Sequence, residues 1–150
     1  MTNIIRIFSM RDDVDLCLDA ERTALLDAGM GKESVEQKAQ ESLVRIENEL
    51  GKDSYCGFTA VEDGTPVGLI FVDLDGDSAF IDNLFVASDR RGQGVGQSLL
   101  RHAIEHLRVQ KVKTIDLMVT SDNETAVNLY QKLGFEVSRL RMTRQLDIDS

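Results

Sequence analysis

The stretch RRGQGVGQ, residues 90–97, sets three glycines beside two arginines, directly ahead of an apolar run. Glycine lets the backbone approach a ligand closely, and the first turn of a helix leaves its N–H groups without intrahelical partners. Such N–H groups, the positive end of the helix dipole and arginine side chains together bind phosphate. With Arg90 alongside, the residues expected to form a phosphate site are Arg91, Gly92, Gln93, Gly94, Val95, Gly96 and Gln97.

Two common phosphate-binding loops do not fit this spacing. A Walker A loop requires G-x-x-x-x-G-K-[ST], and no Lys-Ser or Lys-Thr pair closes residues 90–97. A dinucleotide fingerprint, G-x-G-x-x-G/A, would place the bulky Leu99 where a small residue is needed. Asp116 superficially resembles the ribose-binding acid of that fingerprint, but the loop follows the fourth predicted strand rather than the first. The spacing therefore disfavours an NAD-dependent oxidoreductase, which ranks third among the functions considered for this sequence.

Hydrophobic periodicity and turn residues predict the elements that carry this loop. The predicted strands are 4–8, 54–61, 67–74, 79–86, 114–120, 135–137 and 140–146. The predicted helices are 11–28, 33–50, one that begins at Gly94, and one between Asn123 and Gly134. The order βααβββαβαββ describes a mixed α/β domain, in which short turns make the early strands antiparallel. The single βαβ crossover makes strands 79–86 and 114–120 parallel neighbours.

The charge of the chain is unevenly distributed. The net charge is −9, and residues 1–80 carry 17 acidic and 7 basic side chains, against 9 and 10 in residues 81–150. A nucleic-acid backbone needs a broad basic face, so general nucleic-acid binding is disfavoured and a single polyanionic ligand fits better. The acidic first half would attract a cationic partner.

Composition also narrows the other classes. No stretch approaches about 18 consecutive apolar residues, so no membrane span is expected, and the N-terminal residues lack a signal pattern. The two cysteines, Cys17 and Cys56, form no disulfide framework, and with His102 and His106 they supply a metal site poorly, so no metal is expected. The two histidines are expected on a solvated helix face. A single cytoplasmic domain over residues 1–150 is the default expectation.

Three motifs together resemble the GNAT superfamily of N-acetyltransferases. Arg91-Gly92-Gln93-Gly94-Val95-Gly96 matches its [R/Q]-x-x-G-x-[G/A] signature. FIDNLFV at 80–86 and NETAVNLYQKLGFE at 123–136 resemble its flanking motifs in order and spacing. The specific similarity covers about residues 79–137, which would form the cofactor-binding core.

The resemblance implies acetyl-CoA as cosubstrate, with its pyrophosphate on the backbone amides of residues 91–97. It implies that the pantetheine arm pairs with the backbone of Leu84, Phe85 and Val86, where strand 79–86 must splay from strand 114–120. Asn123 matches a position that helps to hold the cofactor. Tyr130 matches the usual general acid, since a phenol near the sulfur can protonate the leaving thiolate.

The general base is less fixed by the pattern. An ammonium substrate must lose a proton before attack, so a carboxylate, a histidine or a water relay is required. Asp82 occupies a position where some family members carry glutamate, and its shorter side chain favours a water-mediated role. Strict alternation would place Asp82, Leu84 and Val86 on one face of the strand and Ile81, Asn83 and Phe85 on the other.

We therefore expect an enzyme that moves acetyl from acetyl-CoA to a primary amine by direct attack in a ternary complex. The expected acceptor is a small cationic amine or a protein amine. The acidic helices of residues 11–50 are expected to shape the site that binds it. The alternative from another class is a non-catalytic acyl-CoA-binding sensor or scaffold module. The resemblance also makes a homodimer an expectation, because dimers are common in similar proteins.

Overall fold

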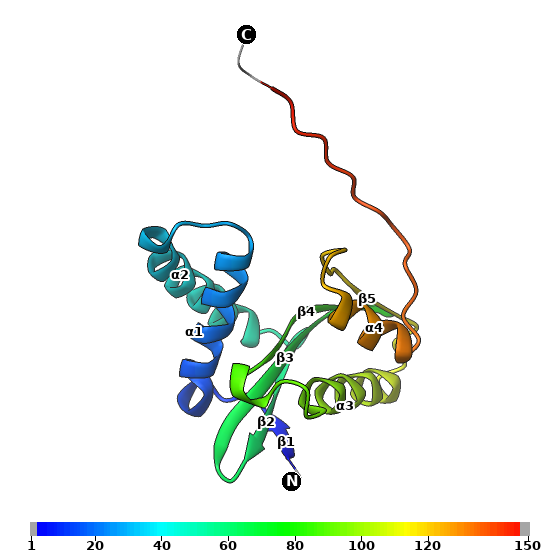
Figure 1. Ribbon diagram of the computed structural model, residues 1–150. Coiled ribbons are helices and arrows are strands. Elements are labelled where there is room, and N and C mark those ends of the chain that lie inside the picture. The colour runs from blue at the N-terminus through cyan, green and yellow to red at the C-terminus, as the bar shows by residue number, and fades with distance from the viewer. Residues whose placement is uncertain (1–2, 148–150) are drawn as a thin grey trace. The chain divides into compact units, whose positions relative to one another are not determined.

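The computed structural model describes residues 3–147, which form two compact units that meet between Met118 and Val119. The first unit carries the sheet and three α-helices, and the second carries one helix (Figure 1). In the described part of the chain no helix is both long and apolar enough to cross a membrane. The elements of the first unit are β1 (Ile4–Ile7), α1 (Met10–Asp27), α2 (Lys32–Leu50), β2 (Tyr55–Glu62), β3 (Thr65–Asp75), β4 (Ser78–Val86), a 3₁₀ turn (Ser88–Arg90), α3 (Val95–Val109) and β5 (Thr114–Leu117).

The five strands form one sheet in the order β1-β2-β3-β4-β5. Neighbouring strands are antiparallel except β4 and β5, which are parallel, so the predicted mixed α/β class is confirmed. The β2–β3 hairpin turns through Asp63 and Gly64, both with positive φ (48° and 79°), as a two-residue hairpin turn requires. The α3 crossover between β4 and β5 is the predicted βαβ unit.

The helices of the first unit cover the two faces of the sheet. On one face, α1 and α2 enclose a cluster of apolar side chains that includes Phe8, Tyr55 and Phe71. The ring of Phe71 stacks on that of Tyr55 at a centroid distance of 5.7 Å. On the other face, α3 buries Val95 and Leu99 against Gly68 of β3, where a Cβ would lie 2.9 Å from both side chains. The sheet is therefore buried on both faces, which explains the nearly continuous burial of β3.

The second unit contains α4 (Glu124–Lys132), and residues 135–147 that follow it contain no strand. The predicted strands 135–137 and 140–146 are therefore wrong for the described residues. Their alternating apolar side chains remain exposed, for example 79% at Leu140 and 91% at Met142. A strand needs a neighbouring backbone with which to pair its N–H and C=O groups, and among the described residues no strand pairs with 135–147.

Candidate functional site

Strand β4 loses one of its two neighbours halfway along its length. It pairs with β5 only from Ser78 to Ile81, where Ile81 lies opposite Leu117. On the other side it pairs with β3 as far as Val86, so within the described residues 82–86 have a strand neighbour on one edge only. The predicted strand 114–120 accordingly ends at Leu117. The free edge of β4 offers backbone N–H and C=O groups to an extended ligand.

A β-bulge lies where this free edge begins. Phe71 of β3 pairs with Asn83 and Val72 pairs with Ile81, so Asp82 is the extra residue on β4. Bulges bend a strand and redirect a side chain, and they are frequent beside functional sites. The bulge breaks the strict alternation that the sequence predicted. Asp82 contacts Tyr55 on the α1–α2 face, where Phe85 also packs, so the expected separation of these two residues is wrong.

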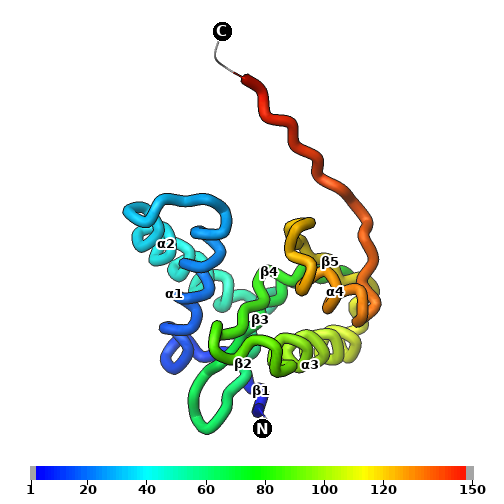
Figure 2. Tube along the Cα trace, viewed as in Figure 1, coloured from blue at the N-terminus to red at the C-terminus, as the bar shows by residue number. Residues whose placement is uncertain are grey.

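The glycine-rich loop leads from β4 into α3, as the chain trace shows (Figure 2). Gly92 and Gly94 have φ values of 76° and 86°, a left-handed conformation that other residues rarely adopt. Gly94 is the N-cap of α3 and no side chain caps this end, so the N–H groups of the first turn remain free for a ligand. An ideal Cβ at either glycine meets no heavy atom within 4 Å, so the space beside the loop is open. This arrangement fits a phosphate group.

The two arginines of the loop have different roles. Arg90 donates from Nε to the buried Glu62 carboxylate at 2.7 Å and pairs with Asp89. It therefore ties the loop to the end of β2, and its expected contact with a phosphate stays a prediction. Arg91 instead donates from Nε to the Val86 carbonyl oxygen at 3.2 Å, and its side chain is exposed.

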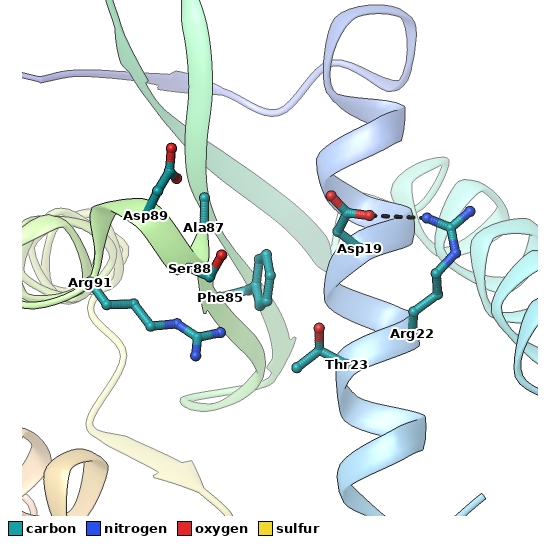
Figure 3. A pocket seen from close by; sticks show the side chains of 8 residues that line it. All are labelled: Asp19, Arg22, Thr23, Phe85, Ala87, Ser88, Asp89 and Arg91. Atoms are coloured by element: carbon teal, nitrogen blue, oxygen red, sulfur yellow. Dashed lines mark hydrogen bonds and ion pairs between the residues drawn. The ribbon is translucent and has the colours of Figure 1, made fainter. Parts of the chain in front are cut away.

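An open pocket of about 420 Å³ lies between α1 and the end of β4 (Figure 3). The guanidinium of Arg91 lies over the ring of Phe85, 5.8 Å from its centroid. On the opposite wall, Asp19 and Arg22 of α1 form an ion pair at 3.0 Å. The pocket thus brings two predicted cofactor-binding residues, Phe85 and Arg91, beside the acidic helix predicted to shape the acceptor site.

Asp82 lies in a network of polar side chains that sequence reasoning did not identify. Tyr55 donates its phenol hydrogen to Asp82 Oδ2 at 2.7 Å, and Arg45 Nη1 lies 3.6 Å from the same oxygen. The Asp82 side chain is 29% exposed, so it can meet solvent or a substrate. Glu21 of α1 is 91% buried nearby; burial raises the pKa of its carboxyl, Arg45 opposes this, and Asp82 raises it further. Only Tyr55 gave a sequence signal, as an aromatic at the start of a strand.

Tyr130 and Asn123 belong to the second unit. The ring of Tyr130 packs edge-on against Phe135 at 5.9 Å, and burial raises the pKa of its phenol. The phenol therefore stays protonated at neutral pH, as a general acid must. The side chain of Asn123 caps α4 by accepting from the Ala126 N–H at 3.2 Å. Its part in holding the cofactor stays a prediction.

The two histidines lie on α3, and the two cysteines lie on α1 and β2. His102 and His106 pack edge-on against Phe58, with ring centroids 4.7 and 5.1 Å away, so the expected solvated face is partly covered. Cys17 is fully buried, and burial raises the pKa of its thiol to about 12, which leaves it un-ionised. Burial also raises the pKa of Cys56. Neither thiol has the ionised character of a nucleophile.

The chain is similar in sequence to several known acetyltransferases. It is 32% identical over 89 residues to the [ribosomal protein bS18]-alanine N-acetyltransferase of Escherichia coli (strain K12), over 59% of this chain and 60% of that enzyme. It is 40% identical over 78 residues to the mycothiol acetyltransferase of Propionibacterium freudenreichii, over 52% of this chain and 22% of that protein. The match thus spans about three fifths of the length of the E. coli enzyme and about one fifth of the length of the mycothiol acetyltransferase.

The fold is shared with solved structures. The PaiA N-acetyltransferase from Thermoplasma acidophilum, in complex with coenzyme A, superposes with a TM-score of 0.81 at 21% identity, over 94% of both chains. A transcriptional regulator from Bacillus halodurans C-125 superposes with a TM-score of 0.76 at 24% identity, over 97% of this chain and 100% of that one. The family model described as "Acetyltransferase (GNAT) family" matches residues 21–135. These residues include β4, the glycine-rich loop and α4, and the chain belongs to the GNAT acetyltransferase family.

Proposed function

We propose that this protein transfers an acetyl group from acetyl-CoA to a primary amine, by direct attack of the amine within a ternary complex. The observation that carries the proposal is the free edge of β4, which runs from the Asp82 bulge to Val86 and is followed, after the glycine-rich loop, by the uncapped first turn of α3. A strand edge and an anion-binding helix end in succession suit a ligand with an extended amide arm and a diphosphate.

The donor is held by backbone more than by side chains. The N–H groups at the start of α3, with Gly92 and Gly94 leaving open space, receive the diphosphate. Arg91 adds a charge-assisted contact after its guanidinium leaves the Val86 carbonyl oxygen. The free edge from Leu84 to Val86 then accepts the amide arm as an added strand. When bound, acetyl-CoA supplies a thioester, whose carbonyl carbon is open to attack by a neutral amine.

Two side chains move the protons. Asp82, through a water molecule, takes the proton that the ammonium must lose before its nitrogen can attack. Tyr130 gives its phenol proton to the departing sulfur as the carbon–sulfur bond breaks, and the raised pKa of this phenol keeps it protonated until then. The surplus proton on the attacking nitrogen leaves as the amide forms and restores the phenol, so that the products are the amide and the free thiol. Free N–H groups on β4 can donate to the carbonyl oxygen as negative charge develops there.

The acceptor is a cationic amine. Helix α1 carries six acidic and two basic side chains, and α2 carries five acidic and three basic, a combined charge of −6. Such a surface attracts cations and repels anions over about a Debye length, roughly 10 Å at 0.1 M salt. A small polyamine, an aminoglycoside-like amine and the N-terminus or a lysine of a basic protein all fit. The E. coli relative acts on a ribosomal protein alanine, which favours a protein N-terminus for the first trial.

An acetylation screen with thiol-release detection tests the proposal. Amines of matched length are offered with acetyl-CoA, one set with extra cationic groups and one set neutral, at low and high salt. Cationic amines should react faster, and added salt should reduce their advantage. Equal rates for both sets would refute the cationic acceptor. Tight acetyl-CoA binding with no transfer to any amine would instead favour a non-catalytic acyl-CoA-binding module.

A further inference from the structure

The carboxylate of Asp82 is held at one oxygen only. Two groups contact the same oxygen, Oδ2: the Tyr55 phenol donates a hydrogen bond to it at 2.7 Å, and the Arg45 guanidinium forms an ion pair with it at 3.6 Å. No hydrogen bond to Oδ1 is present among the described residues, and the side chain is 29% exposed. One oxygen is therefore fixed by the protein, and the other is left for water or a substrate.

The phenol that fixes Oδ2 is itself rigidly held. Tyr55 is 4% exposed, and its ring stacks on Phe71 with an interplanar angle of 17°. Phe71 is in turn confined by Gly57, where an added Cβ would lie 2.6 Å from the ring, and by the edge of Phe8. Burial raises the pKa of Tyr55, and the bond to Asp82 raises it further, so the phenol remains a donor throughout the physiological range.

We propose that Tyr55 and Arg45 are positioning residues, which fix Oδ2 of Asp82 and so leave Oδ1 directed to the water molecule that takes the proton of the acceptor amine. Because its ring stacks on Phe71 in the core, Tyr55 holds its phenol in a fixed position beside the bulge on β4. The catalytic consequence depends on the proposed role of Asp82 as base, whereas the orientation of its carboxylate does not.

The charged groups around Asp82 determine how the loss of the Tyr55 hydroxyl affects its carboxylate. The groups that face Asp82 are Tyr55 from β2, Arg45 from α2, Glu21 from α1 and Asp73 from β3. Two of the four are carboxyl groups, so Tyr55 as a hydrogen-bond donor and Arg45 as a cation are the groups that attract the Asp82 carboxylate. A Tyr55→Phe change removes the hydrogen-bond donor and keeps the ring in its stack.

The first arm of the test measures the carboxylate directly. In protein labelled with ¹³C at the aspartate carboxyl carbons, the Asp82 signal is assigned with Asp82→Asn and compared between variants at one pH. We expect its chemical shift to move in Tyr55→Phe and in Arg45→Gln, because each change removes a group that contacts Oδ2. The control is Thr59→Val, which removes another hydroxyl-to-carboxylate bond from the same strand, Thr59 Oγ1 to Asp13 Oδ2 at 2.8 Å. It should leave the Asp82 signal unchanged.

The second arm is a double-mutant cycle on acetyl transfer. Tyr55→Phe should lower kcat about tenfold with the KM for acetyl-CoA unchanged, and should change kcat less than about twofold in an Asp82→Asn background. An Asp82 carboxyl signal with the wild-type chemical shift in both variants, or fully additive losses in the cycle, overturns the positioning role. A shifted Asp82 signal in a protein that acetylates no amine supports the positioning and refutes the proposed function alone.

Discussion

A single methyl group at Gly94 tests whether the loop conformation holds the donor. Gly94 has a φ of 86° as the N-cap of α3, and a Cβ there meets no heavy atom within 4 Å. A Gly94→Ala substitution therefore causes no clash, and its effect comes from backbone preference. A non-glycine residue in the left-handed region costs about 1–2 kcal/mol. The loop with alanine favours a negative φ, which turns the N–H groups away from the position they hold in the wild type.

That preference converts directly into affinity. If the loop must return to the left-handed conformation to bind, a cost of about 1–2 kcal/mol raises the Kd for acetyl-CoA about 5- to 30-fold. Isothermal titration calorimetry measures this, and thermal unfolding measures stability. Gly76→Ala is the matched control, because Gly76 also has a positive φ (63°) and open space but lies in the β3–β4 turn. The control should lose a similar amount of stability and no affinity for acetyl-CoA. Wild-type affinity in Gly94→Ala would refute the role of the loop conformation in holding the donor.

Three further predictions concern single side chains. Tyr130→Phe should lower kcat about 100-fold with little change in acetyl-CoA affinity, measured by initial rates and calorimetry; an unchanged rate would remove Tyr130 as the acid. Burial tends to raise the pKa of Asp13, but hydrogen bonds from Arg6, the Ser9 N–H and Thr59 lower it below its usual value. Its stabilisation is therefore present above about pH 4 and lost as pH falls through the lowered pKa, so Asp13→Asn should destabilise by about 3 kcal/mol at pH 7 and flatten acid unfolding. Cys17, with its pKa raised to about 12, should be alkylated at pH 8 only after unfolding; labelling of the native protein would contradict its burial.

Much of the fold could be predicted because local patterns and packing agree. The helix predicted for residues 33–50 is observed as Lys32–Leu50, and strand 79–86 as Ser78–Val86. Turn residues with positive φ, such as Gly64, define the hairpins without reference to distant contacts. Residues 140–146 have an equally regular alternation and form no strand, because a strand also depends on a partner that alternation does not specify.

The glycine-rich loop of the candidate site could be located from the sequence because its residues are adjacent in the chain. The loop of residues 91–97 carries its glycines, its helix end and its arginine in one short stretch. The Asp82 network could not be predicted in this way, because Tyr55, Arg45 and Glu21 come from three different elements and come together only in the folded protein. The bulge that turns Asp82 toward them depends on the register between β3 and β4, and no local pattern encodes that register. The ion pair of Arg90 with Glu62 could not be predicted for the same reason, since the two residues lie 28 positions apart in the chain.

The most direct test of the proposed function follows a labelled acetyl group from acetyl-CoA to an amine. Wild-type protein and Asp82→Asn are incubated with labelled acetyl-CoA and cationic amines, including basic peptides with a free N-terminus, and the products are identified by mass spectrometry. We predict acetylated amine and released thiol in equal amounts with the wild type, and a rate about 100-fold lower with Asp82→Asn, which still binds acetyl-CoA. Labelled amine that forms equally fast with Asp82→Asn would contradict the assigned base. No acetylated amine from a wild-type protein that binds acetyl-CoA would contradict acetyl transfer itself.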